Sequence, residues 1–246
     1  KLVSFTGEGN PIVATVALTG GTSNAPIAAD YLDFFSKIQL FDFNTLALPV
    51  SDETVKLAGT NFIKRLRDEE GRKCQVVVAG YAADNESVIN VKNGVILSDG
   101  TVIDAVKATG WVAGATASAG VAQSLTYTAY DGAVDVSPRY VDSDIIAALK
   151  AGEFVFTEKR GTAVVEQDIN SLLTYGAEKS KAFSKNRVLR VLDDVANNTK
   201  QTFEDFYIGK VNNDVDGREL FKANRIAYFD SLVASGAIEA FSPDDI

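Results

Sequence analysis

The sequence contains no histidine, no methionine and a single cysteine, Cys74, among its 246 residues. Without histidine, the chain cannot supply a Ser-His-Asp or Cys-His nucleophile system by itself. Zinc sites built from cysteine and histidine are excluded for the same reason, and one thiol cannot form an internal disulfide. Cys74 lies in the apolar run CQVVVAG, so we expect a small buried core residue. From these shortages we expect that the protein binds neither a metal ion nor a cofactor.

Long apolar runs and a basic, apolar leader are also missing. No run reaches the roughly 18 apolar residues that suggest a membrane span, and no secretory signal is visible. The net charge of −9 argues against broad nucleic-acid binding, which needs a basic surface. We therefore expect neither membrane insertion nor a nucleic-acid partner. The missing initiator methionine predicts a fragment or a processed product.

Alternating strand and helix signals in the first third predict an α/β fold. Successive strands joined by helices favour parallel pairing through right-handed crossovers. Ser51 is expected to cap the second helix, and Gly71 to end it. The expected elements are a strand at 11–20, a helix at 28–38, a strand at 43–50, a helix at 51–71 and a strand at 73–80.

The middle of the chain predicts hairpins, and the last third predicts long helices. Turn signals at Asn93-Gly94 and Asp99-Gly100 lie within alternating apolar residues and indicate a hairpin, and a second hairpin turns near Arg160-Gly161. The fold class is thus α/β, or mixed α+β, with a mixed sheet followed by a helical C-terminal part. We assign residues 1–125 to an α/β portion and 126–246 to a C-terminal portion, packed as one core. Further helices are expected at 103–120, 142–152, 186–206 and 218–236.

The helix expected at 186–206 has one apolar face, because its apolar residues recur in steps of three and four. That face comprises Val188, Leu192, Val195, Phe203 and Phe206, with Thr199 in the gap.

Two segments look like ligand sites but fail in detail. Within residues 207–220, four positions of an EF-hand calcium loop are filled, by Asn212, Asp214, Asp216 and Gly217. The ligand positions 9 and 12 fall on Leu220 and Ala223, so we interpret the segment as a polar connection between helices. Residues 18–26, LTGGTSNAP, lack the Gly-Lys-Ser/Thr ending of a phosphate loop, and we expect a turn.

Charged residues gather at several places. Five basic residues lie within twelve positions of this acidic chain: Lys179, Lys181, Lys185, Arg187 and Arg190. Several precede or open a predicted helix, where the macrodipole disfavours cations, which favours a patch facing an acidic partner. The alternative is a solvated basic face. Three pairs of adjacent carboxylates, Asp193-Asp194, Glu204-Asp205 and Asp244-Asp245, are expected to be solvated and not catalytic dyads.

Taken in order, these segments resemble the sheath proteins of contractile phage tails and of phage-tail-like bacteriocins. The most characteristic matches lie at Asp168–Leu172, Arg187–Arg190 and Tyr207–Asn213. The stretches that carry the resemblance are EFVFTEKRGTAVVEQDINSLLTY, KNRVLRVLDDVANNTKQTFEDFYIGKVNNDVDGRELFKANRIAYFDSL and GAIEAF. Weaker likenesses upstream are LTGGTSNAPIAADYLDFF, FNTLALPVSD, VKNGVILSDGT and WVAGATASAG. The resemblance covers most of the chain, from about residue 11 to residue 241.

The resemblance implies a structural protein and no enzyme. Such a subunit forms a helical homo-oligomer around an inner tail tube, meets a baseplate and a tail terminator, and contracts to drive the tube through a cell envelope. It belongs to a virion tail or phage-tail-like particle assembled in the bacterial cytoplasm, and the basic cluster would face the tube.

Family members also carry terminal arms that extend a neighbour's sheet. The present chain is therefore expected to be a core fragment and to be monomeric alone. The alternative, from the fold alone, is a small-molecule-binding or enzymatic α/β domain. Its site would lie at the carboxyl ends of the strands near residues 20, 50 and 80.

Overall fold

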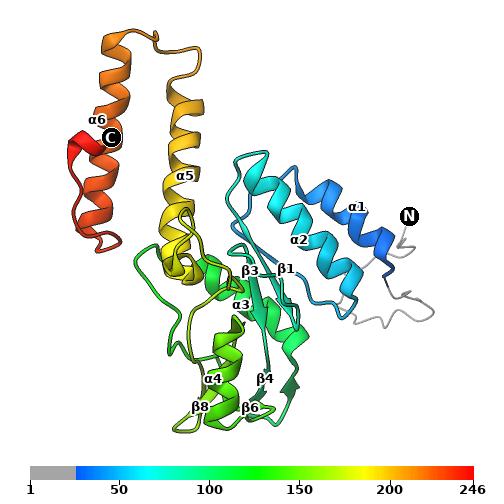
Figure 1. Cartoon of the computed structure of the whole chain (residues 1–246). Coiled ribbons are helices and arrows are strands. Elements are labelled where there is room, and N and C mark those ends of the chain that lie inside the picture. The colour runs from blue at the N-terminus through cyan, green and yellow to red at the C-terminus, as the bar shows by residue number, and fades with distance from the viewer. Residues whose placement is uncertain (1–25) are drawn as a thin grey trace, which may run out of the picture.

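A computed structural model describes residues 26–246 of the chain (Figure 1). The strand predicted at 11–20 and most of the loop at 18–26 lie outside the described residues. The helices are α1 (Ala28–Ile38), α2 (Glu53–Asp68), α3 (Ala105–Ser118), α4 (Asp142–Lys150), α5 (Asn186–Phe206) and α6 (Val215–Ala234), with the 3₁₀ helices η1 (Lys181–Ser184) and η2 (Pro243–Asp245). The strands are β1 (Thr45–Ala47), β2 (Gln75–Ala79), β3 (Val88–Val91), β4 (Gly94–Leu97), β5 (Val102–Ile103), β6 (Ala133–Ser137), β7 (Glu153–Phe154), β8 (Phe156–Lys159) and β9 (Thr162–Val165). The mixed α/β prediction is confirmed.

A parallel sheet with the strand order β1-β2-β3-β7 forms the centre of the body. Successive residues of β2 point to opposite faces, as the two-residue period of a strand requires. Val76 and Val78 pack with α1 and α2, whereas Val77 packs with α3 and the antiparallel strands. Cys74 is buried just before β2, as predicted. The core at α3 also takes residues from both sides of the predicted 125/126 boundary, which itself stays a prediction.

Of the two turn signals in the first predicted hairpin, the one at Asn93-Gly94 is wrong, because these residues connect strands of different sheets. β3 belongs to the parallel sheet, whereas β4 pairs antiparallel with β5 and β6. The Asn93 side chain accepts from the Phe156 N–H at 2.9 Å and donates to the Phe156 carbonyl at 3.0 Å. A Cβ on Gly94 would lie 1.8 Å from the Ile103 carbonyl oxygen, so the glycine allows a close backbone approach.

The other two turn predictions are confirmed. Asp99-Gly100 connects the antiparallel strands β4 and β5, and Arg160-Gly161 connects β8 and β9. Both residues of the second turn have positive φ, 56° and 77°, as a tight hairpin turn needs.

Two helix starts differ from prediction. Asp52, and not Ser51, caps α2, because its carboxylate accepts from the Thr54 and Val55 N–H groups. α6 begins at Val215, so Gly217 lies inside its first turn, where a Cβ would lie 2.0 Å from the Asn212 carbonyl oxygen.

α5, α6 and their connection, residues 186–234, form a helical hairpin that projects from the body (Figure 1). The first half of α5 lies against the body, and α6 returns alongside α5, so that Tyr228 of α6 reaches Asp194 in the first half of α5. Phe221 of α6 packs edge-on against Phe203 and Tyr207, with ring centroids 5.3 and 4.9 Å apart. The predicted apolar face of α5 is therefore only partly covered, and Phe206 at its end is 66% exposed.

Candidate interaction surfaces and a polar cleft

Two of the five predicted basic residues form ion pairs within the protein. Lys179 Nζ lies 2.6 Å from Glu86 Oε1, next to the parallel sheet. Arg190 Nη2 lies 2.7 Å from Asp168 Oδ2, and only 10% and 1% of these two side chains are exposed. The Arg190 side chain is therefore held in a buried ion pair within the fold.

The other three, Lys181, Lys185 and Arg187, are exposed on η1 and at the start of α5. Lys185 donates to Gln167 Oε1 at 2.9 Å, and Arg187 donates to the Gly236 carbonyl at 3.0 Å. Within residues 26–246, the Lys181 side chain makes neither an ion pair nor a hydrogen bond. These three residues are the part of the cluster that can face a partner.

Asp168 explains why cations are tolerated at the start of α5. Its carboxylate accepts hydrogen bonds from Asn186 Nδ2, Arg190 Nη2 and the Leu125 N–H, at 2.9, 2.7 and 3.0 Å. A carboxylate at a helix N-terminus offsets the macrodipole that disfavours the cations. Sequence reasoning missed this role, although Asp168 opens one of the stretches that carry the family resemblance.

Asp193 and Asp194 are not the solvated pair that the sequence predicted. Arg67 on α2 donates two hydrogen bonds to Asp193, at 2.6 and 2.7 Å, and Tyr228 on α6 donates to Asp194. Burial raises the pKa of Asp193, and the hydrogen bond and charge of Arg67 oppose that shift. The second carboxylate pair, at 204–205, is exposed as predicted.

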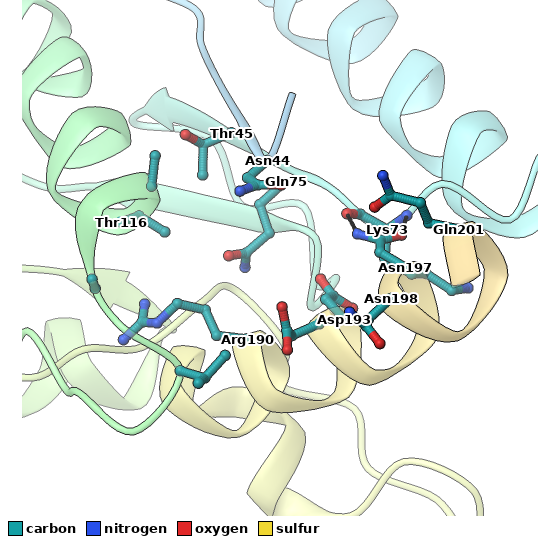
Figure 2. A pocket seen from close by; sticks show the side chains of 14 residues that line it. Asn44, Thr45, Lys73, Gln75, Thr116, Arg190, Asp193, Asn197, Asn198 and Gln201 are labelled. Atoms are coloured by element: carbon teal, nitrogen blue, oxygen red, sulfur yellow. Dashed lines mark hydrogen bonds between the residues drawn. The ribbon is translucent and has the colours of Figure 1, made fainter. Parts of the chain in front are cut away.

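A polar cleft of about 290 Å³ lies between α3, α5 and the amino ends of β1 and β2 (Figure 2). Arg190, Asp193 and Asn197 reach it from α5, Gln75 from β2 and Thr116 from α3. Asn197 is already engaged, because its amide exchanges two hydrogen bonds with the backbone of Lys73. The amide and charged groups make the cleft suited to a polar ligand.

The carboxyl ends of the strands look different. The cavities beside Pro49, after β1, have two carboxylates in their walls, Asp30 and Asp52. Both accept backbone hydrogen bonds at helix starts, of α1 and α2. Within residues 26–246, no group of three or more His, Cys, Asp or Glu side chains is arranged to hold a metal ion. The cavities beside Pro49 therefore add no support for the alternative, a small-molecule-binding or enzymatic site at the carboxyl ends of the strands.

Large apolar side chains are exposed along the helical hairpin. These hairpin apolar residues are Leu192, Phe203, Phe206, Ile208, Val215, Leu220 and Val233. Exposed apolar surface of this kind marks protein–protein contacts. Among the helices of the described part, none combines the length and hydropathy needed to cross a membrane.

Comparison with family profiles gives two matches that together span nearly all described residues. Residues 24–171 match the phage tail sheath protein central domain, and residues 178–246 match the phage tail sheath C-terminal domain.

Two curated relatives agree with these matches. The phage-like element PBSX protein XkdK of Bacillus subtilis (strain 168) is 43% identical over 241 residues, which cover 94% of this chain and 52% of that protein. The tail sheath protein of Clostridium phage phiCD119 is 30% identical over 208 residues, covering 85% of this chain and 58% of that protein. The chain thus spans about half the length of the curated relatives it matches.

Solved structures show the same fold. The sheath tail protein of Desulfitobacterium hafniense has a TM-score of 0.88 at 48% identity, covering 96% of this chain and 57% of that chain. The sheath tail protein Lin1278 of Listeria innocua has a TM-score of 0.84 at 39% identity, covering 93% and 54%. The contracted helical sheath of the anti-feeding prophage has a TM-score of 0.64 at 14% identity, covering 87% and 61%, which shows a shared fold.

Proposed function

The chain belongs to the phage tail sheath protein family, and from this we propose that it is a structural subunit of a contractile tail sheath. The subunit polymerises helically around an inner tail tube and contracts to drive the tube through a cell envelope. The observation that carries the proposal is the match of both sheath domains, in order, to one continuous fold. No catalytic residue enters this mechanism.

Contraction needs two packed states that differ in subunit contacts, because a switch is driven by differential interaction between its states. The hairpin apolar residues support this proposal, since they offer surface that a neighbouring subunit can bury. The body beneath them is held by buried ion pairs and two core clusters, so it can move as a unit.

We also propose that the exposed part of the basic cluster faces the inner tube. Lys181, Lys185 and Arg187 are the members available for this, and complementary charge would orient subunits on an acidic tube surface. The baseplate and a tail terminator are further proposed partners. The proposed location is a virion tail or a phage-tail-like particle, assembled in the bacterial cytoplasm.

Electron microscopy of the full-length protein tests the main proposal. Straight hollow cylinders of uniform width are expected, alone or on tubes. A full-length protein that stays monomeric at high concentration, with and without tubes, would overturn it.

Charge reversal tests the tube-facing role. Lys181→Glu, Lys185→Glu and Arg187→Glu together should reduce tube-guided assembly, and less so at high salt, where electrostatic attraction is screened. Arg190 is left unchanged, because its reversal would break the buried pair with Asp168. Each of the three reversals is also made alone, and Lys107→Glu on α3, outside the cluster, is the control for the single variants. Assembly that is unchanged in the triple variant would contradict the role.

A further inference from the structure

A groove of about 390 Å³ lies between α4, residues 167–175 and η1, and we call it the lysine groove. Three exposed lysines line it, Lys150, Lys181 and Lys185. Within residues 26–246, Lys150 and Lys181 make neither an ion pair nor a hydrogen bond, and Lys185 donates only to the neutral Gln167 side chain. Among the described residues that line the groove there is no aspartate or glutamate.

The acidic residues of the neighbouring segments leave the lysine groove positively charged. Three of them form ion pairs, Glu153 with Lys92, Glu166 with Lys159 and Asp168 with Arg190. Asp142 and Asp144 lie in the first turn of α4, whereas Lys150 is its last residue. Glu178 is exposed in the loop before η1, and the exposed Arg187 follows Lys185 after one residue.

The lysine groove also offers apolar surface. Ile146, Leu173 and Tyr175 line it and are 52%, 39% and 43% exposed. Positive charge beside exposed apolar side chains fits a protein segment that carries both carboxylates and apolar residues.

The chain itself carries such a segment at the hairpin tip, which we define as residues 204–220. Four large apolar side chains are exposed there, at Phe206, Ile208, Val215 and Leu220. The same residues include five acidic and two basic side chains, a net charge of −3. The half-buried Lys222 lies just outside the tip.

Most of the acidic side chains at the hairpin tip are free to bind a partner. Asp214 caps α6, but the other four make neither an ion pair nor a hydrogen bond within residues 26–246. The two basic side chains are engaged locally, since Lys210 donates to the Asp205 carbonyl and Arg218 to the Asn213 side chain. The four free carboxylates are those of Glu204, Asp205, Asp216 and Glu219.

One helix keeps the hairpin tip away from the lysine groove of its own subunit. Lys185 is the N-cap of α5 and Phe206 is its last residue, so the two surfaces lie at opposite ends of a 21-residue helix. At 1.5 Å per residue, α5 holds them roughly 30 Å apart. Figure 1 shows the hairpin projecting away from the body. A tip can therefore reach only the groove of another copy, and such a head-to-tail contact builds an open helix and not a closed dimer.

We propose that the lysine groove of one subunit binds the hairpin tip of a neighbouring subunit wherever the groove does not face the inner tube. The free carboxylates of the tip pair with the three lysines, and its apolar side chains cover Ile146, Leu173 and Tyr175. This contact rests on the proposed helical polymer and names two of its surfaces. Because contraction moves the tube past the sheath, contacts of Lys181 and Lys185 to the tube must break, and the hairpin tip can replace them.

Cysteine cross-linking of the full-length protein without tubes tests the contact. The double variant Leu173→Cys with Ile208→Cys places one thiol in the lysine groove and one at the hairpin tip. With a short bismaleimide it should give a covalent ladder well beyond the dimer on a denaturing gel, because every subunit offers both surfaces. Each single variant should stop at the dimer. Leu173→Cys with Val102→Cys, on β5 of the body, is the matched control and should give no ladder, and mass spectrometry identifies the linked residues.

Charge reversal tests the pairing. Lys150 is exposed and unpaired, so Lys150→Glu in the double-cysteine protein should fold normally and slow ladder formation by about fivefold at low salt, as expected for an exposed charge pair. Adding Asp205→Lys and Asp216→Lys should recover part of that loss. Lys107→Glu on α3 is the control and should leave the rate unchanged. A ladder that forms at the same rate with Lys150→Glu would overturn the pairing.

Electron microscopy of the same samples separates this contact from the sheath proposal. Cylinders without a ladder would overturn the contact and leave the proposed sheath function standing, whereas a ladder without cylinders would support the contact and count against the sheath. Absence of both would overturn both. If Lys150→Glu formed the ladder normally but failed to assemble on tubes, the lysine groove would belong to the tube and the proposed contact would be wrong.

Discussion

Arg67 on α2 donates hydrogen bonds from Nη1 and Nη2 to the two carboxylate oxygens of Asp193 on α5, at 2.6 and 2.7 Å. Both side chains are largely buried, with 7% and 15% exposed. Arg67 also donates to the Cys74 carbonyl at the start of β2, so one guanidinium connects α2, the parallel sheet and α5. This contact fastens the helical hairpin to the body.

Removing one partner of this ion pair should destabilise the fold strongly. Asp193→Ala leaves the Arg67 guanidinium buried without its carboxylate, which typically costs about 3–5 kcal/mol. The double variant Arg67→Met with Asp193→Leu should cost less than Asp193→Ala, because no buried charge is left unpaired. Urea unfolding of the single and double variants measures both differences.

The exposed pair Lys37–Asp33 on α1 is the control for that experiment. Its side chains are 71% and 61% exposed, so Asp33→Ala should change the free energy of unfolding by less than about 1 kcal/mol. If Asp193→Ala cost no more than Asp33→Ala, the buried pair would have no structural role.

The Cys74 thiol should be unreactive in the folded protein. Burial raises its pKa to about 11, and the nearby charge of Arg67 only partly opposes that shift. Because the thiolate is the reactive form, labelling at pH 8 should be roughly two orders of magnitude slower in the native state than in urea. A disulfide-exchange reagent followed by absorbance measures both rates, and rapid stoichiometric labelling without denaturant would contradict the prediction.

The pair Lys179–Glu86 should contribute a pH-dependent stabilisation. Burial raises the pKa of Glu86, but the hydrogen bond and the charge of Lys179 lower this pKa by a larger amount, so the net shift is downward. A lowered folded-state pKa gives stability that is present above the unfolded value, roughly 4.3, and is lost as the pH falls through the folded-state pKa.

Lys179→Met should therefore destabilise the protein at pH 7, and the difference from the unmodified chain should shrink below about pH 4. Urea unfolding across pH 3–7 follows this difference. Lys181→Met, on the neighbouring 3₁₀ helix, removes a charge without an ion pair and should show no such trend. If the difference in the free energy of unfolding between Lys179→Met and the unmodified chain stayed constant down to pH 3, the Lys179–Glu86 ion pair would not be the source of the stabilisation.

The sequence predicts best where the signal is local. Residues 186–206 carry a regular helical period, and α5 has those same bounds. The Asn93-Gly94 dipeptide was misleading because a glycine in a strand pattern can mark either a turn or a close backbone approach. Gly94 makes no turn, and it lets the Ile103 carbonyl oxygen approach its backbone closely. Ser51 and Asp52 are adjacent capping residues, and only the backbone geometry decides between them.

The candidate site was less predictable because its contacts join distant parts of the chain. Arg190 and Asp168 are 22 residues apart, and Arg67 and Asp193 are 126 residues apart. A run of basic residues is interpreted as a surface patch when the distant carboxylates that pair with some of them are unknown. Family resemblance identified the region at Asp168, although it did not identify the side-chain contacts.

Calcium should leave the protein unchanged. Asp214, at position 3 of the apparent EF-hand loop, instead caps α6 by accepting from the Gly217 N–H at 2.8 Å. Positions 9 and 12, Leu220 and Ala223, lie within α6 and supply no carboxylate. Thermal unfolding with millimolar calcium or with a chelator should give the same melting temperature, and a saturable calcium-dependent rise would reopen the site.

Substitutions of the hairpin apolar residues should separate assembly from folding. Phe206 and Leu220 are 66% and 56% exposed, so Phe206→Ser and Leu220→Ser should change the free energy of unfolding by only about 0.5 kcal/mol. If neighbouring subunits bury these side chains, the same variants of the full-length protein should form fewer cylinders in electron micrographs. Val102→Ser, on β5 of the body and similarly exposed, is the matched control and should assemble normally. Normal assembly of both hairpin variants would exclude this surface from the subunit contact, while equal loss in all three would indicate a general effect of surface hydrophobicity.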